Sequence, residues 1–237
     1  RVILRGSLGA SGSSTFVAGR DPETLREALA QIGARTDNSI YLVEAMLATT
    51  VSPNIGLFIS PVDGRISFVS VTDQILVSEV TYNGNAFPSE ARTLDRMLAS
   101  ARTLAEWLRD RGMTGYVGFD FCEYEPEPGG EPDFFLTEIN PRVNGATYAT
   151  ALMQKVNMGL SESGPGTVEA FFTRFVNTAA RSFGQLREIW RGRFLDPNTG
   201  RGFVPYNTGC LAYGRCLLAA FGQSLDEVRA LASEAIP

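Results

Sequence analysis

Two strand-like segments joined by a short acidic connection constrain the fold of this chain more than any other feature. Residues Tyr116–Tyr124 and Asp133–Asn140 are rich in aromatic and aliphatic side chains, whereas the connection Glu125–Pro132 is acidic and rich in proline. This pattern predicts that the two segments pair as one antiparallel hairpin. We therefore expect an antiparallel sheet to form part of the fold.

The other segments predict a mixture of strands and helices. Further strands are expected at residues 1–5, 41–47, 54–60 and 66–72, with a strand pair at 202–221 that turns near 213–214. Helices are expected from Asp21 to Gly33, from Ser89 to Gly112, from Thr167 to about Arg191, and after the capping box Ser224–Glu227. The glycine- and serine-rich segment Gly159–Thr167 is expected to be a linker or mobile loop. Together these elements predict an α+β protein with a boundary near residue 160.

Three polar residues of the hairpin are candidates for a metal site. Side chains alternate across a strand, so Glu138 and Asn140 share a face, and Asp120 on the partner strand can face them. Two carboxylates held together repel each other unless a cation neutralises them, and Mg²⁺ prefers oxygen ligands of this kind. Arg142 follows directly and can neutralise a phosphate or a developing oxyanion. The alternative, that these are solvated strand residues, leaves their matching spacing unexplained.

Composition excludes several classes of chemistry. The 237 residues include no histidine, and Lys155 is the only lysine beside twenty arginines. Catalytic triads or dyads that depend on histidine, and zinc sites with histidine ligands, are therefore excluded.

The charge and the cysteines limit the partners and the compartment. The formal net charge of −5 argues against nucleic-acid binding, and no apolar run is long enough to span a bilayer. The three cysteines form no CxxC pair, which favours reduced thiols in a cytoplasmic protein.

A glycine- and serine-rich loop, Gly6–Thr15, lies between two strand-like segments. Glycines allow successive backbone N–H groups to point at one anion, and serine hydroxyls add further donors. The loop is not a P-loop, because no Gly-Lys-Ser/Thr follows it. Two interpretations remain open, a flap over nucleotide phosphates and a flexible surface loop. The flap is favoured by the metal motif, since a nucleoside triphosphate needs both a cover and a cation.

In these motifs the sequence resembles the ATP-grasp carboxylate–amine ligases, and most closely the pheganomycin-type peptide ligase family. The resemblance covers roughly residues 1–157, and it is carried by Val117–Phe121, Leu136–Arg142, Gly145–Tyr148, Leu42–Leu47 and Ala10–Thr15. It implies that Asp120, Glu138 and Asn140 bind the metal, that Arg142 is catalytic, and that Asn144 and Tyr148 contact substrate. It implies nucleotide contacts from Arg5, Gly9, Ser11, Gly12, Ser13, Ser14, Glu44, Met46 and Leu47. Arg5 stands where the family usually has a phosphate-binding lysine.

The resemblance also implies a fold and an activity. The expected fold is an ATP-grasp fold of two α+β subdomains that grip ATP, with an additional C-terminal α+β module and without the family's N-terminal domain. The expected division is 1–47 for the flap subdomain, 48–158 for the core with the metal site, and 159–237 for the C-terminal module. The expected cofactors are ATP and Mg²⁺, with Mn²⁺ as a substitute, and the reaction forms an amide or peptide bond through an acyl phosphate.

Three alternatives to this activity stay open. One is a ligase of the biotin-carboxylase or D-alanine ligase type, which uses another carboxylate. The second is a non-catalytic nucleotide-binding module, and the third is a purely structural interaction domain. For the ligase we expect small-molecule or peptide substrates, no nucleic-acid or membrane partner, and a homodimer as one arrangement of the chain.

Overall fold

The computed structural model describes residues 1–6, 15–35, 40–77, 81–163 and 167–234. They fall into two compact units, one made of Arg1–Thr49 with Leu76–Tyr82 and the other of Thr50–Ile75 with Asn83–Pro237. The expected divisions after residues 47 and 158 stay predictions, and the second unit includes both sides of the latter. Among the described residues, no helix is both long and apolar enough to cross a membrane.

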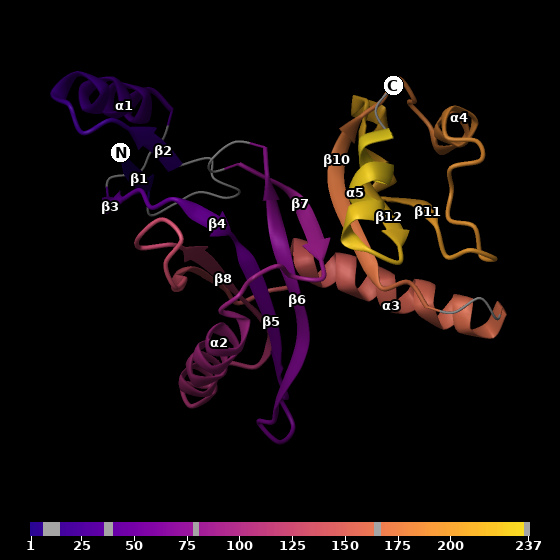
Figure 1. Cartoon of the computed structure of the whole chain (residues 1–237), viewed down its shortest axis with the longest axis horizontal. Helices are drawn as coiled ribbons and strands as arrows, with labels where there is room; N and C mark the ends of the chain where they lie inside the picture. The colour runs from indigo at the N-terminus through magenta and orange to yellow at the C-terminus, as the bar shows by residue number, and fades with distance from the viewer. Residues whose placement is uncertain (7–14, 36–39, 78–80, 164–166, 235–237) are drawn as a thin grey trace. The chain divides into compact units, whose positions relative to one another are not determined.

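The first unit is a small antiparallel sheet with one helix. Its elements are β1 (Val2–Gly6), β2 (Thr15–Ala18), α1 (Pro22–Arg35) and β3 (Tyr41–Ala45), with strand order β2-β1-β3 (Figure 1). The Asp21 carboxylate accepts a hydrogen bond from the backbone N–H of Thr24 at 2.9 Å, so Asp21 caps α1 as expected. The helix continues two residues beyond the predicted end at Gly33. Its core contains Leu4, Ala18, Ala28 and Ile32.

The second unit is built on a nine-stranded sheet of the described residues, in the order β11-β12-β10-β7-β6-β5-β8-β4, with β9 also paired to β8. Its strands are β4 (Thr49–Val51), β5 (Pro53–Ile59), β6 (Ile66–Leu76), β7 (Tyr82–Phe87), β8 (Gly115–Tyr124), β9 (Asp133–Asn140), β10 (Ala170–Asn177), β11 (Gly202–Tyr206) and β12 (Arg215–Gly222). Its helices are α2 (Leu94–Arg109), α3 (Gly145–Ser163), α4 (Phe183–Ile189), η1 (Thr208–Tyr213) and α5 (Leu225–Glu234).

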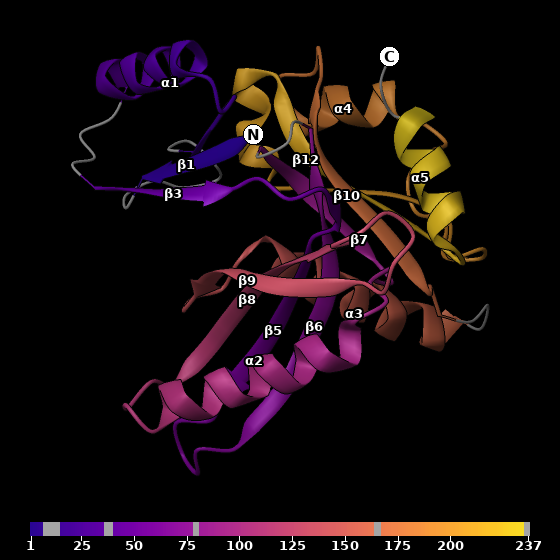
Figure 2. The same ribbon diagram turned by 60° about the vertical axis from the view of Figure 1, so that its left-hand side comes forward.

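Helix α2 covers one face of the sheet at β5 and β8 (Figure 2). Met97, Ala101 and Ala105 of α2 are fully buried against apolar residues of those strands, which alternate with the polar residues of the opposite face. The buried carboxylate of Glu123 holds the start of α2, because it accepts hydrogen bonds from both the backbone N–H and the hydroxyl of Thr93 at 2.7 Å. The α2 side of this sheet is therefore a closed core of apolar side chains, with the Glu123 carboxylate buried at the start of the helix.

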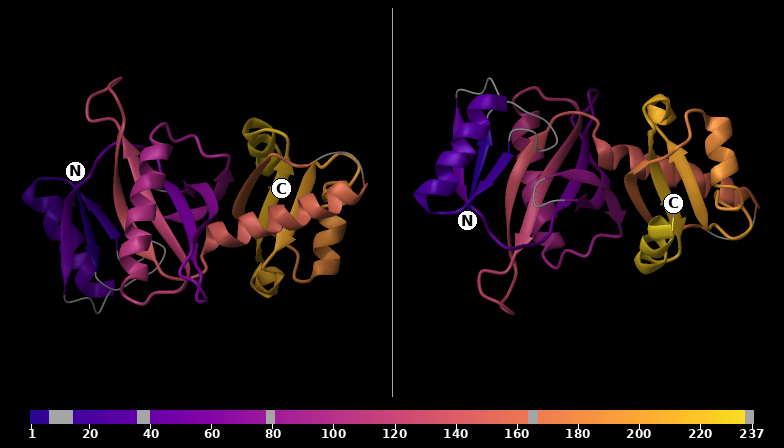
Figure 3. Two further views of the ribbon diagram at one scale, coloured as in Figure 1. Left: turned by 90° about the horizontal axis from the view of Figure 1, so that it is seen from below. Right: turned by 90° about the horizontal axis from the view of Figure 1, so that it is seen from above.

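Helix α3 packs on β10 and β12 within the second unit (Figure 3). Its residues Ala149, Leu152 and Met153 belong to a core with Phe171 and Phe221. Gly159 lies inside α3, so the expectation of a linker at Gly159–Thr167 is wrong for the helical residues up to Ser163. Glycine is a poor helix former, but apolar neighbours such as Leu160, which is buried, hold this part of the helix.

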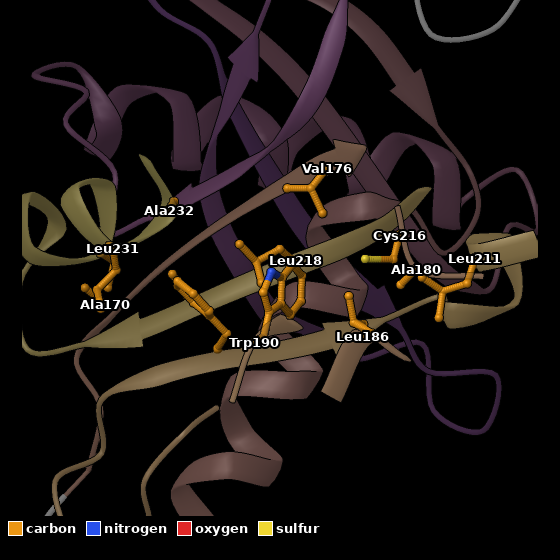
Figure 4. Close-up of a cluster of buried hydrophobic side chains, with 13 residues drawn as sticks. Ala170, Val176, Ala180, Leu186, Trp190, Leu211, Cys216, Leu218, Leu231 and Ala232 are labelled. Carbon is orange, nitrogen blue, oxygen red and sulfur yellow. The ribbon is translucent and has the colours of Figure 1, made fainter. Parts of the chain in front are cut away.

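The C-terminal strands carry their own core, centred on Trp190 (Figure 4). Trp190 is 2% exposed and lies close to Leu218, while its ring centroid is 5.8 Å from that of Phe203. The helix expected from Thr167 to Arg191 is wrong, because residues Ala170–Asn177 form β10 and only Phe183–Ile189 form a helix. The expected pairing of strands within Gly202–Phe221 is confirmed, with the 3-10 helix η1 in the connection.

The junction between β7 and β10 joins these C-terminal strands to the rest of the sheet. The two backbones pair at Phe171 with Phe87 and at Phe172 with Ala86. Next to these pairs, the Thr173 hydroxyl continues the contact between the strands. It accepts a hydrogen bond from the Asn85 backbone N–H at 2.8 Å and donates one to the Asn85 carbonyl at 3.3 Å. A single side chain thus satisfies both backbone groups of Asn85 at this point.

Candidate metal and nucleotide site

The hairpin predicted from the sequence is present, and its register brings the expected polar residues together. In the β8–β9 pair, Asp120 lies opposite Glu138 and Gly118 lies opposite Asn140, with a register shift just after Asp120. Residues directly opposite each other in an antiparallel pair share a face, and so do residues two apart along one strand. Asp120, Glu138 and Asn140 therefore lie on one face, as expected.

Two amides hold the Asp120 carboxylate from opposite sides. The Asn140 side-chain amide donates to Oδ2 of Asp120 at 3.0 Å, and the Asn54 side-chain amide donates to Oδ1. Burial, together with the neighbouring Glu138 carboxylate, raises the pKa of Asp120 to about 6, against the lowering effect of these hydrogen bonds. Ionised Asp120 is therefore unfavourable unless a positive charge lies nearby. A bound cation would supply that charge, so the electrostatics of the site favour cation binding.

Glu138 and Arg142 are the exposed members of the site. The Arg142 guanidinium lowers the pKa of Asp120, so it acts on that carboxylate, and one of its nitrogens donates to the Val143 carbonyl at 3.4 Å. The turn after β9 is closed by a hydrogen bond from the Arg142 N–H to the Asn140 carbonyl at 2.8 Å. Arg142 therefore leaves the sheet beside the partly buried Asp120 carboxylate, with an exposed side chain.

Asn144 and Tyr148, the predicted substrate residues, lie at the start of α3. The Asn144 side-chain oxygen accepts from the Thr147 backbone N–H at 3.2 Å, so Asn144 caps the helix. Its amide nitrogen lies over Gly118, where a Cβ atom would be only 2.2 Å away. Glycine at position 118 therefore makes room for Asn144 above the sheet. Tyr148 is 58% exposed in the first turn of the helix.

Sequence reasoning missed Asn54. It lies opposite both Asp120 on β8 and Thr72 on β6, and it is only 3% exposed. The one available signal is an asparagine at the start of an otherwise apolar strand segment, where amide side chains are uncommon. Its partner could not be inferred, because the register of β5 on β8 is set by tertiary packing.

Asn54 also belongs to a polar band that crosses the sheet on the same face. Thr72 lies opposite Asn54 and accepts a hydrogen bond from the Asn85 side-chain amide at 3.0 Å, and Asn85 in turn bonds to Thr173. Each of these residues is at most 3% exposed. The metal-site candidates therefore lie at one end of a band of polar side chains that runs over β10, β7, β6, β5 and β8.

The donor set fits a magnesium ion. Within the described part of the chain, no three Asp, Glu, Cys or His side chains gather in one place, and this site offers two carboxylates and an amide. Because the Asn140 amide nitrogen donates to Asp120, its oxygen is the atom directed elsewhere and is a suitable ligand. Magnesium commonly takes one or two carboxylates from the protein and completes its octahedron with water and phosphate oxygens.

The nucleotide contacts predicted in the first unit are only partly described. Gly9, Ser11, Gly12, Ser13 and Ser14 lie outside the described residues. Arg5 and Glu44 form an ion pair across β1 and β3, with Nε of Arg5 3.2 Å from Oε2 of Glu44. A nucleotide that used both side chains as predicted would have to replace this pair. Met46 and Leu47 follow β3, and the Met46 N–H donates to the Arg1 carbonyl at 3.2 Å.

Comparison with known proteins identifies the fold. Residues 57–146, which include β8, β9 and the candidate metal ligands, match the model of the ATP-grasp domain family. The chain also superposes on N5-carboxyaminoimidazole synthetase from Staphylococcus aureus bound to ADP, with a TM-score of 0.64 and 9% identity. The chain has an ATP-grasp fold. The α+β architecture expected from the sequence is thereby confirmed.

Two further solved structures carry the same ATP-grasp architecture. Carboxyaminoimidazole ribonucleotide synthase from Aspergillus clavatus, bound to ATP, gives a TM-score of 0.64 at 10% identity. Biotin carboxylase from Campylobacter jejuni gives 0.66 at 12% identity. In all three comparisons 99% of this chain is covered, but only 60%, 61% and 56% of the other chain. The chain thus spans about three fifths of the length of these ATP-grasp proteins. A search of the curated proteins finds no significant match.

Proposed function

We propose that this chain is the nucleotide- and metal-binding part of an ATP-dependent carboxylate–amine ligase. The observation that carries the proposal is the arrangement around Asp120, in which a partly buried carboxylate, an exposed carboxylate and an amide oxygen share one sheet face within an ATP-grasp domain. A triphosphate and its cation need this combination of negative charge and oxygen ligands.

Each residue has a distinct part in the proposed reaction. The carboxylate substrate attacks the γ-phosphate of ATP, the bond between the γ-phosphorus and the bridging oxygen breaks, and ADP leaves. An amine then attacks the acyl phosphate, loses a proton, and releases phosphate as the amide forms. Asp120, Glu138 and Asn140 hold the cation, which neutralises the phosphate oxygens. Arg142 neutralises the negative charge of the transferring phosphoryl group or of the tetrahedral oxyanion.

The absence of histidine is compatible with this chemistry. Phosphoryl transfer depends mainly on positioning and charge neutralisation, which carboxylates, amides and arginines supply. Arg5 replaces the expected phosphate-binding lysine with a planar guanidinium, which binds phosphate through two parallel hydrogen bonds. We propose that Asn144 and Tyr148 border the substrate site, and that the nucleotide releases Arg5 and Glu44 from their ion pair.

The identity of the carboxylate separates two forms of the proposal. The sequence motifs favour an amino acid or peptide. A bicarbonate substrate is favoured by the structural neighbours, since one of them is the biotin carboxylase domain of a Hydrogenobacter thermophilus 2-oxoglutarate carboxylase in complex with MgADP and bicarbonate. The amino-acid or peptide form is the primary proposal, and bicarbonate is the alternative.

The first test is metal-dependent nucleotide binding by the full chain. Calorimetric titration with ADP should give binding with Mg²⁺ that is largely lost with excess EDTA. Glu138→Gln and Asn140→Ala should each weaken the Mg²⁺-dependent part of binding by at least tenfold. Glu131→Gln is the matched control, because Glu131 is an exposed acid in the connection of the same hairpin. Equal binding by wild type and both site variants would refute the metal assignment.

The second test concerns turnover. ADP release is measured with ATP and Mg²⁺ in the presence of amino acid and dipeptide mixtures, and separately with bicarbonate. Stimulation by amino acid pairs with formation of an amide product supports the primary proposal. Stimulation by bicarbonate alone supports the alternative. Tight nucleotide binding without ADP release under any condition would favour a non-catalytic module.

A further inference from the structure

Asn54 stabilises one orientation of the Asp120 carboxylate. β8 has β5 on one side and β9 on the other, and each neighbour contributes one amide to a different oxygen of Asp120. An ionised carboxylate only accepts hydrogen bonds, so the Asn54 amide nitrogen must face it. With both oxygens held from opposite sides, the carboxylate plane cannot rotate without breaking one of these bonds.

The other end of the Asn54 side chain argues against a purely structural role. Its oxygen, Oδ1, is buried and has no hydrogen-bond partner. A buried acceptor without a partner opposes folding, because it has lost its hydrogen bonds to water. An apolar residue at this position would avoid that cost, yet the strand places an amide here, directly opposite Asp120. The gain must therefore lie in the bond to Asp120.

The surroundings keep Asn54 itself in place. Its strand is paired on both sides, with Thr72 opposite it on β6 and Asp120 opposite it on β8. Gly118 has no side chain, and a Cβ atom there would lie 3.0 Å from the Asn54 amide nitrogen. The amide of Asn54 therefore occupies a close-fitting position over the backbone of β8.

We propose that Asn54 is a positioning residue that sets the orientation of Asp120 for cation binding. The inference rests on the proposed function, since it needs Asp120 to be a metal ligand. Asn54 acts through Asp120 and does not itself have to contact the cation. Its loss should leave the ligand set complete but allow Asp120 to rotate, so cation affinity falls while the fold is retained.

The experiment measures Mn²⁺ affinity by electron paramagnetic resonance, with the full chain and saturating ADP. Asn54→Ala should weaken Mn²⁺ binding by about 10- to 100-fold, the usual effect of removing a group that orients a metal ligand. Asn54→Ser keeps a hydroxyl donor and should recover part of this loss. Asn85→Ala is the matched control, because Asn85 is an equally buried asparagine of the same band, separated from β8 by β6 and β5.

The outcomes separate this inference from the proposed function. Weakened Mn²⁺ binding in Asn54→Ala, partial recovery in Asn54→Ser and near-normal binding in Asn85→Ala support it, with circular dichroism confirming that each variant is folded. Mn²⁺ affinity within twofold of wild type in Asn54→Ala overturns it, while the metal site stands. An equal loss in Asn85→Ala also overturns it, since the effect would then come from the whole band. If wild type binds ADP without any Mn²⁺ dependence, the proposed function fails and this inference falls with it.

Discussion

Replacing Gly118 with alanine should displace the cap of α3. The added Cβ would lie 2.2 Å from the Asn144 amide nitrogen, whereas an ordinary contact begins at about 3.4 Å. Asn144 must therefore move by roughly 1.2 Å. Its capping bond to the Thr147 N–H is already 3.2 Å long, so a shift of that size breaks it.

The expected cost follows from these contacts. Loss of an asparagine cap costs about 1 kcal/mol, and crowding in a packed site costs about 1–3 kcal/mol. Alanine also lowers the conformational entropy of the unfolded chain relative to glycine, which offsets this loss by about 0.4–1 kcal/mol. We expect Gly118→Ala to lower the free energy of unfolding by about 1–3 kcal/mol.

Urea unfolding of a double-mutant cycle with Asn144→Ala tests the reasoning. If the added methyl group acts by displacing Asn144, the double variant should be less destabilised than the sum of the single variants by about 1 kcal/mol. Gly159→Ala in α3 is the control, because a Cβ there meets no atom within 4 Å, and it should stabilise the protein slightly. Effects of Gly118→Ala and Asn144→Ala that add within about 0.3–0.5 kcal/mol would refute the proposed clash.

Two further predictions concern titratable groups. Burial raises the pKa of Cys216 to about 11, so little of this thiol is ionised at pH 8. Iodoacetamide at pH 8 should therefore modify Cys122 and Cys210 before Cys216, as measured by peptide mapping. Modification of Cys216 at the same rate as Cys122 and Cys210 would contradict the prediction. Burial also raises the pKa of Asp73 above its ordinary value, so its contribution to stability is largest at low pH and is lost as the pH rises through the folded-state pKa. Between pH 4 and pH 7, the free energy of unfolding of the wild type, measured with urea, should therefore fall relative to that of Asp73→Asn. A difference between the two proteins that does not change with pH would refute a raised pKa for Asp73.

The β8–β9 hairpin could be predicted because its information is local. Apolar alternation, a short polar connection and the two-residue period of a strand are enough to place Asp120, Glu138 and Asn140 on one face. Asn54 could not be predicted in the same way. It is 66 residues from Asp120 in sequence, and a shift of one residue in the β5–β8 register would have sent its side chain into the core beneath α2.

The failure over residues 167–191 has a different cause. Ala170–Asn177 contains three phenylalanines and a valine around a central Thr173-Arg174 pair, and periodicity alone does not separate such a short segment from a helix. The first residues of the strand are buried on both faces, because Ala170 lies in the core that includes α5 and Phe171 lies in the core that includes α3. Its short length and aromatic content favour a strand, but the helical spacing of apolar residues that follow extends the predicted helix back over it.

The junction between β7 and β10 has a consequence for any attempt to isolate the metal site. A chain cut after residue 158 would leave β7 as an edge strand, with Asn85 stripped of the Thr173 hydroxyl that satisfies its backbone. It would also leave Phe87 without its stacked neighbour Phe171, whose ring centroid lies 5.7 Å away. Such an apolar edge invites pairing between molecules and aggregation. The C-terminal strands are therefore no removable appendage, and a minimal protein that retains the metal site would need a substitute strand beside β7.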